Sequence, residues 1–293
     1  MADYPNGNQV TYTYDANGNR TAKSAGGNIL QSYVYDWENH MVQASGPGGV
    51  LGNYYYNADG LRVAKVTASG TTGFLYDGEK LLQEVGSTGQ TTATYTSTRG
   101  TVNSALIGIA NSAESHVPLM DALGSLRFLL DSSQNASDGY AFEAFGRQVS
   151  GGGLTPNPYH FVGEYGYYQN WETGLQLLSV SYYDAEVGRF VTRDPIGFGG
   201  GDWNIYGYVR DAATRLIDPS GNMSKAQEKL CIFWCNAVFF PEKCEDIACV
   251  ATCQYLARSG CDALKAKLRV EKEWMLQVIM MGIVNAFCDE VVH

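Results

Sequence analysis

Cysteines gathered near the C-terminus carry the clearest potential for covalent chemistry in this chain. All seven lie between Cys231 and Cys288, and four of them form two Cys-x-x-x-Cys pairs. A spacing of four places both sulfurs of a pair on one face of a helix, and two such helices turning at Pro241 would bring the pairs opposite one another. The spacing predicts a helical hairpin clasped by two disulfides, Cys231 with Cys253 and Cys235 with Cys249.

Two other states of these cysteines are compatible with the sequence. Structural zinc sites favour Cys-x-x-Cys spacings and often include histidine, whereas the only histidine after Gly221 is His293, so we expect no metal ion and no cofactor. Reduced thiols that pack as small apolar core residues fit as well as disulfides do. Disulfides would contribute much of the stability, because a domain of about 70 residues has a small core.

The chain ends in a stretch that is typical of one long helix, residues 262–292. It is polar and basic at its front and almost wholly apolar over the fifteen residues from Trp274 to Cys288. Because a transmembrane helix needs about 20 apolar residues, we expect either a core helix of a small bundle or a segment that acts on a membrane after release. No residue set typical of a nuclease, a deaminase or an ADP-ribosyltransferase occurs after Gly221, so the activity of this segment is not predicted.

Two Asp-Pro-x-Gly motifs precede this segment, at Asp194–Gly197 and Asp218–Gly221. In such a motif the aspartate accepts hydrogen bonds at the first position, proline presets φ at the second, and glycine permits the exit of the chain. Taken alone, each motif predicts a tight turn.

A tyrosine-centred unit recurs upstream with a period of about 20 residues. Its copies are YTYDANGNRTAKS, YVYDWENHMVQA, YYYNADGLRVAK and FLYDGEKLLQEV, which align Tyr14, Tyr35, Tyr56 and Tyr76. A repeat this short, with Asn-Gly or Asp-Gly between alternating apolar and polar runs, is one β-hairpin that cannot bury its own face. We therefore expect about five hairpin units stacked into a continuous antiparallel sheet.

The alternation places strands and turns in detail. The strands are expected at residues 10–14, 29–35, 50–56, 61–66, 72–76, 80–85 and 91–96, with turns at Asn17-Gly18, Asp59-Gly60 and Asp77-Gly78. The pattern weakens over residues 101–117, for which we make no assignment, and resumes at Asp121. The run Gly151-Gly152-Gly153 is interpreted as a flexible break.

Composition divides the chain near Gly221. Residues 1–221 contain 19 of the 20 tyrosines and 32 of the 34 glycines, whereas the cysteines all follow. The net charge of −10 argues against nucleic acid as a partner. The start, MADYPNGNQVTYTYD, has no basic region followed by an apolar stretch, so we expect no secretory signal peptide and synthesis in the cytoplasm.

Residues 157–221 resemble the core domain that closes the Rhs (YD-repeat) proteins of bacteria. The matching features are an NPY-F-G start, the TGL-L pair, SYYDAEVGRF, Asp194-Pro195-Ile196-Gly197, the Tyr206/Tyr208 pair and Asp218-Pro219-Ser220-Gly221. LMDALGSLRFLLD and YAFEAFGR match the lead-in, so the resemblance covers residues 10–221 almost continuously.

The resemblance implies a mainly β fold in three parts. Residues 1–156 would be stacked antiparallel YD-repeat hairpins in a curled sheet forming part of a cocoon, and 157–221 the Rhs-associated core. Residues 222–293 would be a small α-helical, cysteine-rich variable domain, a candidate toxin. Because family shells are much longer, this sheet is not expected to enclose the tail.

The resemblance also implies an intramolecular aspartyl protease that cuts just after the second motif. Asp194 and Asp218 match its two aspartates, and the cut would fall between Asn222 and Met223. Two carboxylates held close cannot both ionise, so one serves as base and the other as acid. Arg189 and Arg193 would hold a carboxylate ionised or form salt bridges. The family usually has an apolar residue where this chain has Asn222 and a proline where it has Ala213.

The function implied is the C-terminal Rhs-type unit of a bacterial polymorphic toxin, in which a β carrier shields a small effector. The partners implied are an immunity protein and a secretion apparatus or longer Rhs shell. The apolar stretch from Trp274 to Cys288 adds a target membrane as a possible partner, and the N-terminal sheet edge a second copy of the chain. Export would use a contact-dependent or type VI-like system. The alternatives are a structural or adhesive YD-repeat module and a displaced, inactive Rhs tip with a helical plug or dimerisation tail.

Overall fold

Two antiparallel sheets dominate the part of the chain that the computed structural model describes, residues 2–3, 9–98, 105–111, 114–194 and 204–218. The larger sheet has fifteen strands and the smaller has four. Two short 3₁₀ helices, Gly163–Tyr165 and Val209–Asp211, are the helical elements of these residues. The expectation of a mainly β protein is confirmed, while the expected helical cysteine-rich domain lies outside the described residues.

The large sheet follows chain order, so every strand pairs with its sequence neighbours. Its strands are β1 (Ala2–Asp3), β2 (Gln9–Tyr14), β3 (Arg20–Ala25), β4 (Asn28–Tyr35), β5 (Met41–Gly46), β6 (Gly49–Tyr56), β7 (Arg62–Thr67), β8 (Gly70–Asp77), β9 (Lys80–Gly86), β10 (Thr91–Ser97), β11 (Leu106–Asn111), β12 (Ser115–Met120), β13 (Leu126–Leu130), β14 (Ala136–Phe142) and β15 (Gln148–Gly152). The seven expected strands are all present, and their ends differ from the expected ones by at most two residues.

Side chains alternate between the two faces of these strands. Tyr33, Tyr54, Phe74 and Tyr95 are buried on one face. Their immediate neighbours Val34, Tyr55 and Leu75 point the other way and are about half exposed. One buried aromatic ring per hairpin thus lines the inner face of the sheet.

The residue after the YD tyrosine begins a turn of one type in the first three units, at Asp15, Asp36 and Asn57. In the first unit, Gly18 N–H donates to the Asp15 carbonyl (3.0 Å) and Asp15 N–H to the Asn19 carbonyl (3.0 Å), while Asp15 Oδ1 accepts the Asn19 N–H (2.8 Å). Gly18 has φ +82°. This is a type I turn with a left-handed fourth residue. Six other turns of the sheet have the same two backbone bonds, beginning at Asp36, Asn57, Gly86, Asp121, Asp131 and Glu143.

Contacts between strands explain why a tyrosine recurs at the same position of the repeats. Tyr35, Tyr56 and Tyr76 donate their hydroxyls to the backbone carbonyls of Arg20 (3.0 Å), Met41 (2.7 Å) and Arg62 (2.9 Å). Each carbonyl lies at the start of a strand that neighbours the tyrosine's own strand. The YD tyrosine therefore links its hairpin to the preceding one.

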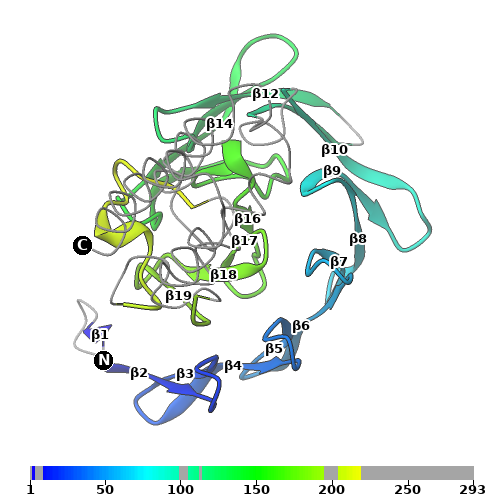
Figure 1. Cartoon of the computed structure of the whole chain (residues 1–293). Coiled ribbons are helices and arrows are strands. Elements are labelled where there is room, and N and C mark those ends of the chain that lie inside the picture. The colour runs from blue at the N-terminus through cyan, green and yellow to red at the C-terminus, as the bar shows by residue number, and fades with distance from the viewer. Residues whose placement is uncertain (1, 4–8, 99–104, 112–113, 195–203, 219–293) are drawn as a thin grey trace, which may run out of the picture.

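The large sheet curves around the small sheet (Figure 1). The small sheet consists of β16 (Tyr168–Gln169), β17 (Gln176–Leu178), β18 (Ser181–Asp184) and β19 (Arg189–Phe190). Three inner-face rings meet tyrosines of the segment that contains the small sheet: Tyr54 with Tyr182 (5.8 Å between ring centroids), Phe74 with Tyr168 (5.6 Å) and Tyr95 with Tyr159 (4.8 Å). Buried aromatic surface thus joins the repeats to the core.

Three expectations need correction or completion. Gly151 and Gly152 belong to β15, where they pair with Tyr140 and Gly139, so they are not a flexible break. The glycine run alone predicts flexibility, but pairing with β14 holds this strand in the sheet. The unassigned region contains β11 and the first half of β12, and the sheet is longer than five units. None of the described helices has the length and apolar character needed to span a membrane.

Candidate functional site

Asp194 lies just beyond β19, at the edge of the small sheet. Its side chain is partly buried, and its backbone N–H donates to the Ile205 carbonyl at 2.8 Å. Nearby, Phe190 N–H donates to the Tyr206 carbonyl (3.0 Å), and Arg189 bridges to Gly207. Residues 204–208 therefore run beside the segment that ends in Asp194.

Asp218 is buried, with 4% of its surface exposed. Its backbone N–H donates to the hydroxyl of Tyr167 at 2.7 Å, and this hydroxyl is hydrogen-bonded to that of Tyr208 at 2.8 Å. Both tyrosines are almost completely buried. Burial, the neighbouring Tyr208 and the charge of Asp218 raise the pKa of Tyr167. Burial also raises the pKa of Tyr208, so both hydroxyls remain neutral around Asp218.

Both aspartates are thus attached to one short segment. Ile205 accepts the N–H of Asp194, and Tyr208, three residues later, reaches Asp218 through Tyr167. The side chain of Tyr208 is itself fixed by packing on Tyr183 at 4.6 Å. These attachments hold the backbone of both aspartates against residues 205–208.

The two arginines predicted to support this site are exposed. Arg189 pairs with Asp184 in the ladder between β18 and β19. Arg193 lies against the first YD turn, where a Cβ placed on Gly18 would be 2.5 Å from Arg193 Nε. Asn222, Met223 and the four cysteines Cys231, Cys235, Cys249 and Cys253 lie outside the described residues.

Sequence reasoning missed the residues that attach this site to the rest of the protein. No sequence pattern indicates Tyr167 as a hydrogen-bond partner of Asp218. Tyr208 belongs to a Tyr-x-Tyr pair, which does not by itself indicate its hydrogen bond to Tyr167. Asp184, which pairs with Arg20 at 2.8 Å, had a usable signal: Tyr183-Asp184 repeats the Tyr-Asp signature of the upstream units.

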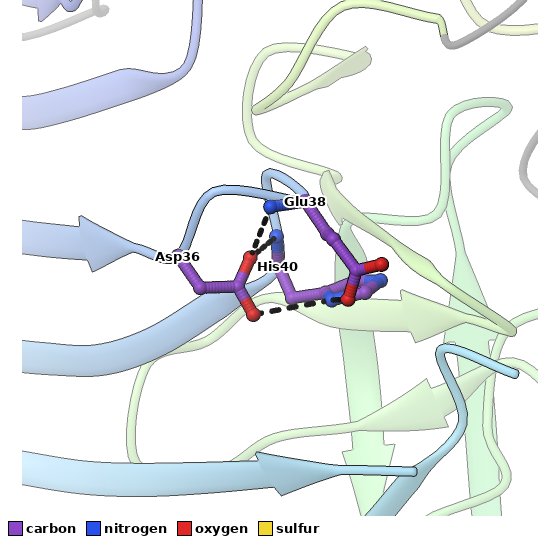
Figure 2. A group of neighbouring side chains, drawn as sticks. All are labelled: Asp36, Glu38 and His40. Carbon is purple, nitrogen blue, oxygen red and sulfur yellow. Dashed lines mark hydrogen bonds and ion pairs between the residues drawn. The ribbon is translucent and has the colours of Figure 1, made fainter. Parts of the chain in front are cut away.

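A second cluster, Asp36, Glu38 and His40, contains residue types that bind metal ions (Figure 2). One potential ligand atom from each lies within 4.8 Å of the others. However, Asp36 Oδ1 accepts the N–H groups of Glu38 and His40, both at 2.9 Å. This is the cap that Asp15 and Asp131 also provide in their turns. The His40 ring stacks on Tyr56 at 4.8 Å. Turn formation and packing account for this cluster.

A family model described as RHS repeat matches residues 3–29 of this chain. The tRNA3(Ser)-specific nuclease WapA of Bacillus spizizenii is 27% identical over 223 residues, covering 73% of this chain and 9% of that protein. Double-stranded DNA deaminase toxin A of Burkholderia cenocepacia is 28% identical over 180 residues, covering 55% of this chain and 12% of that protein.

A solved structure has a similar fold. The crystal structure of TcdB2-TccC3 matches with a TM-score of 0.52 and 20% identity, covering 72% of this chain and 13% of that one. In each of these comparisons the chain spans a small part of its relative.

Proposed function

The chain belongs to the Rhs (YD-repeat) family, and we propose that it is the C-terminal Rhs-type unit of a bacterial polymorphic toxin. Residues 1–156 and 157–221 would form the β carrier and its core, and residues 222–293 the effector. The ends of the two sheets support this division, since the large sheet ends at Gly152 and the small one begins at Tyr168. The Burkholderia relative is a toxin, which supports the functional class.

We further propose that the core releases its effector by cutting the peptide bond between Asn222 and Met223. One ionised aspartate of the pair Asp194 and Asp218 takes a proton from water, and the water oxygen bonds to the carbonyl carbon of Asn222. The other, protonated, aspartate gives its proton to the nitrogen of Met223 as the C–N bond breaks. The products are a carboxyl group on Asn222 and an amine on Met223.

The attachment of both aspartates to residues 204–208 is the observation that carries this proposal. Asn222 follows Asp218 by four residues, so the scissile bond is tethered to the site. Tethering of this kind can contribute about 7–11 kcal/mol towards the barrier. Arg189 and Arg193 would act in support, by stabilising an ionised carboxylate.

Intact mass spectrometry of the purified chain over a range of pH tests self-cleavage. We expect fragments that end at Asn222 and begin at Met223, and a single full-length species for Asp194→Asn and Asp218→Asn. Asp211→Asn is the matched control, since Asp211 is an exposed aspartate of the same region. A wild-type chain that stays intact at every pH, or Asp→Asn variants that still cleave, would overturn the site.

The effector role of residues 222–293 is proposed together with its partners. Growth inhibition by the complete chain, absent from a chain that ends at Asn222, would support a toxin that requires an immunity protein. Leakage of dye-filled liposomes would identify a membrane target. Equal growth of cells expressing either chain would favour the structural module or the inactive tip. Non-reducing peptide mapping tests the pairing of Cys231 with Cys253 and Cys235 with Cys249.

A further inference from the structure

The first YD turn, residues 15–19, and the strands that it joins contact both the segment that ends in Asp194 and residues 204–208. The hydroxyl of Tyr206 donates to the Gly18 carbonyl at 2.8 Å, and Arg20 N–H donates to the Val191 carbonyl at 2.8 Å. The rings of Tyr14 and Tyr206 lie 5.4 Å apart. These contacts join residues that are more than 170 positions apart in the sequence.

The absence of a side chain at Gly18 is part of this contact. A Cβ at that position would lie 2.5 Å from Arg193 Nε and 2.7 Å from the Tyr206 hydroxyl, closer than real Cβ atoms approach. Arg193 and Tyr206 therefore occupy the space that any other residue would need. Asp194 follows Arg193 directly, and Ile205, which accepts the N–H of Asp194, precedes Tyr206.

Other turns of the same type have a glycine at the same position without a contact to Arg193 or Tyr206. Gly60, with φ +77°, has His40 Nε2 (3.0 Å) and Val180 Cγ1 (3.5 Å) as its nearest neighbours. Gly89, with φ +83°, has nothing within 4 Å. The contact with Arg193 is thus a property of the first turn, and not of the turn type.

We propose that the first YD turn is a positioning element of the self-cleavage site, which holds the Asp194 segment through Gly18. This inference rests on the proposed self-cleavage. Gly18 touches the side chains of Arg193 and Tyr206, and its carbonyl accepts the Tyr206 hydroxyl. The first turn is therefore packed on the residues that directly adjoin Asp194 and Ile205. Cleavage then requires the first hairpin to have folded and docked on the core, and release of the effector is restricted to chains whose sheet is complete.

Three alanine variants of the full-length chain separate docking from backbone strain. Gly18→Ala, Gly60→Ala and Gly89→Ala place a side chain at the same left-handed position, with φ of +82°, +77° and +83°, so they share the strain of that conformation. Only Gly18→Ala forces Arg193 and Tyr206 to move. Because a misplacement of ~1 Å can slow a reaction about 100-fold, we expect cleavage to slow ~10–100-fold in Gly18→Ala and to change little in Gly89→Ala, at equal folded fractions.

Hydrogen exchange provides a readout that does not depend on cleavage. In Asp218→Asn chains, which keep their full length, Gly18→Ala should accelerate exchange at residues 189–194 and 204–208 relative to Gly89→Ala. Equal exchange in the two variants would overturn the docking. If the wild type cleaves and Gly18→Ala cleaves as fast as Gly89→Ala, the positioning role of Gly18 is wrong, while the proposed self-cleavage stands. A wild type that never cleaves would instead overturn the proposed function on which this role depends.

Discussion

Arg20 in the first YD unit and Asp184 at the end of β18 form a buried ion pair of 2.8 Å between residues 164 positions apart. Their side chains are 3% and 4% exposed. Burial alone would lower the pKa of Arg20, but the charge of Asp184 and its hydrogen bond outweigh burial and raise it. The cation therefore persists inside the protein and joins the first hairpin to the core.

Removing one partner of this pair should be costly, because the other charge remains buried. We expect Asp184→Asn to lower the free energy of unfolding by about 3–5 kcal/mol. Arg20→Met combined with Asp184→Asn should cost less than the sum of the two single changes. Glu143→Gln is the control, since Glu143 pairs with Arg147 at an exposed position, where a pair is worth about 0–1 kcal/mol. Urea denaturation measures all four variants, and equal effects of Asp184→Asn and Glu143→Gln would contradict the prediction.

The YD tyrosine should stabilise the sheet through its hydroxyl. Tyr56→Phe removes the hydrogen bonds of this hydroxyl to the carbonyl of the buried Met41 and to the Tyr182 hydroxyl, so we expect a loss of about 1–2 kcal/mol. Tyr55→Phe is the matched control, because the adjacent Tyr55 points outward and is 54% exposed. Thermal and urea unfolding should distinguish the two variants. A Tyr55→Phe effect as large as that of Tyr56→Phe would show that the link is not specific.

The local features of the sheet were predictable, and its attachment to the core was not. Alternation and Asn-Gly or Asp-Gly pairs act over a few residues, so the strands at Tyr35 and Tyr56 and the turn at Gly18 could be predicted from the sequence. The contacts of Gly18 with Tyr206 and of Asp218 with Tyr167 join distant segments, and no local pattern encodes such pairings. In the first of these contacts, Gly18 has a left-handed conformation and its carbonyl accepts the Tyr206 hydroxyl.

An aspartate that begins a turn of the same type as the first YD turn should act chiefly on that turn. Asp131 Oδ1 accepts the N–H groups of Ser133 (2.8 Å) and Asn135 (2.9 Å), so Asp131→Ala leaves both donors to solvent and should cost about 1 kcal/mol. Asp77→Ala is the comparison, because Asp77 begins a two-residue turn in which it pairs directly with Lys80. Chemical denaturation should show a smaller loss for Asp77→Ala. A reversed order would assign the stabilisation to backbone geometry rather than to the cap.

His160 should make the stability of the core depend on pH. Its ring is packed against Tyr140 (4.2 Å) and Trp171 (5.0 Å), and burial lowers its pKa to about 4, against weaker raising effects from the Asn157 backbone and Asp138. In the unfolded chain the pKa returns to about 6.5. Between these values the unfolded chain binds more protons, so the free energy of unfolding should decrease as pH falls from about 6.5 to about 4.

The full contribution of His160 over this window is about 3 kcal/mol, and above pH ~6.5 it has no further effect. His160→Gln cannot titrate, so its stability should fall less steeply than that of the wild type over the same window, after alignment of the two curves at neutral pH. Urea denaturation at a series of pH values measures the difference in slope, and the ring-proton NMR signal of His160 reports the midpoint in the folded protein. Parallel curves for the two proteins, or a ring that titrates near its ordinary pKa while the fold is intact, would contradict burial of a neutral imidazole between Tyr140 and Trp171.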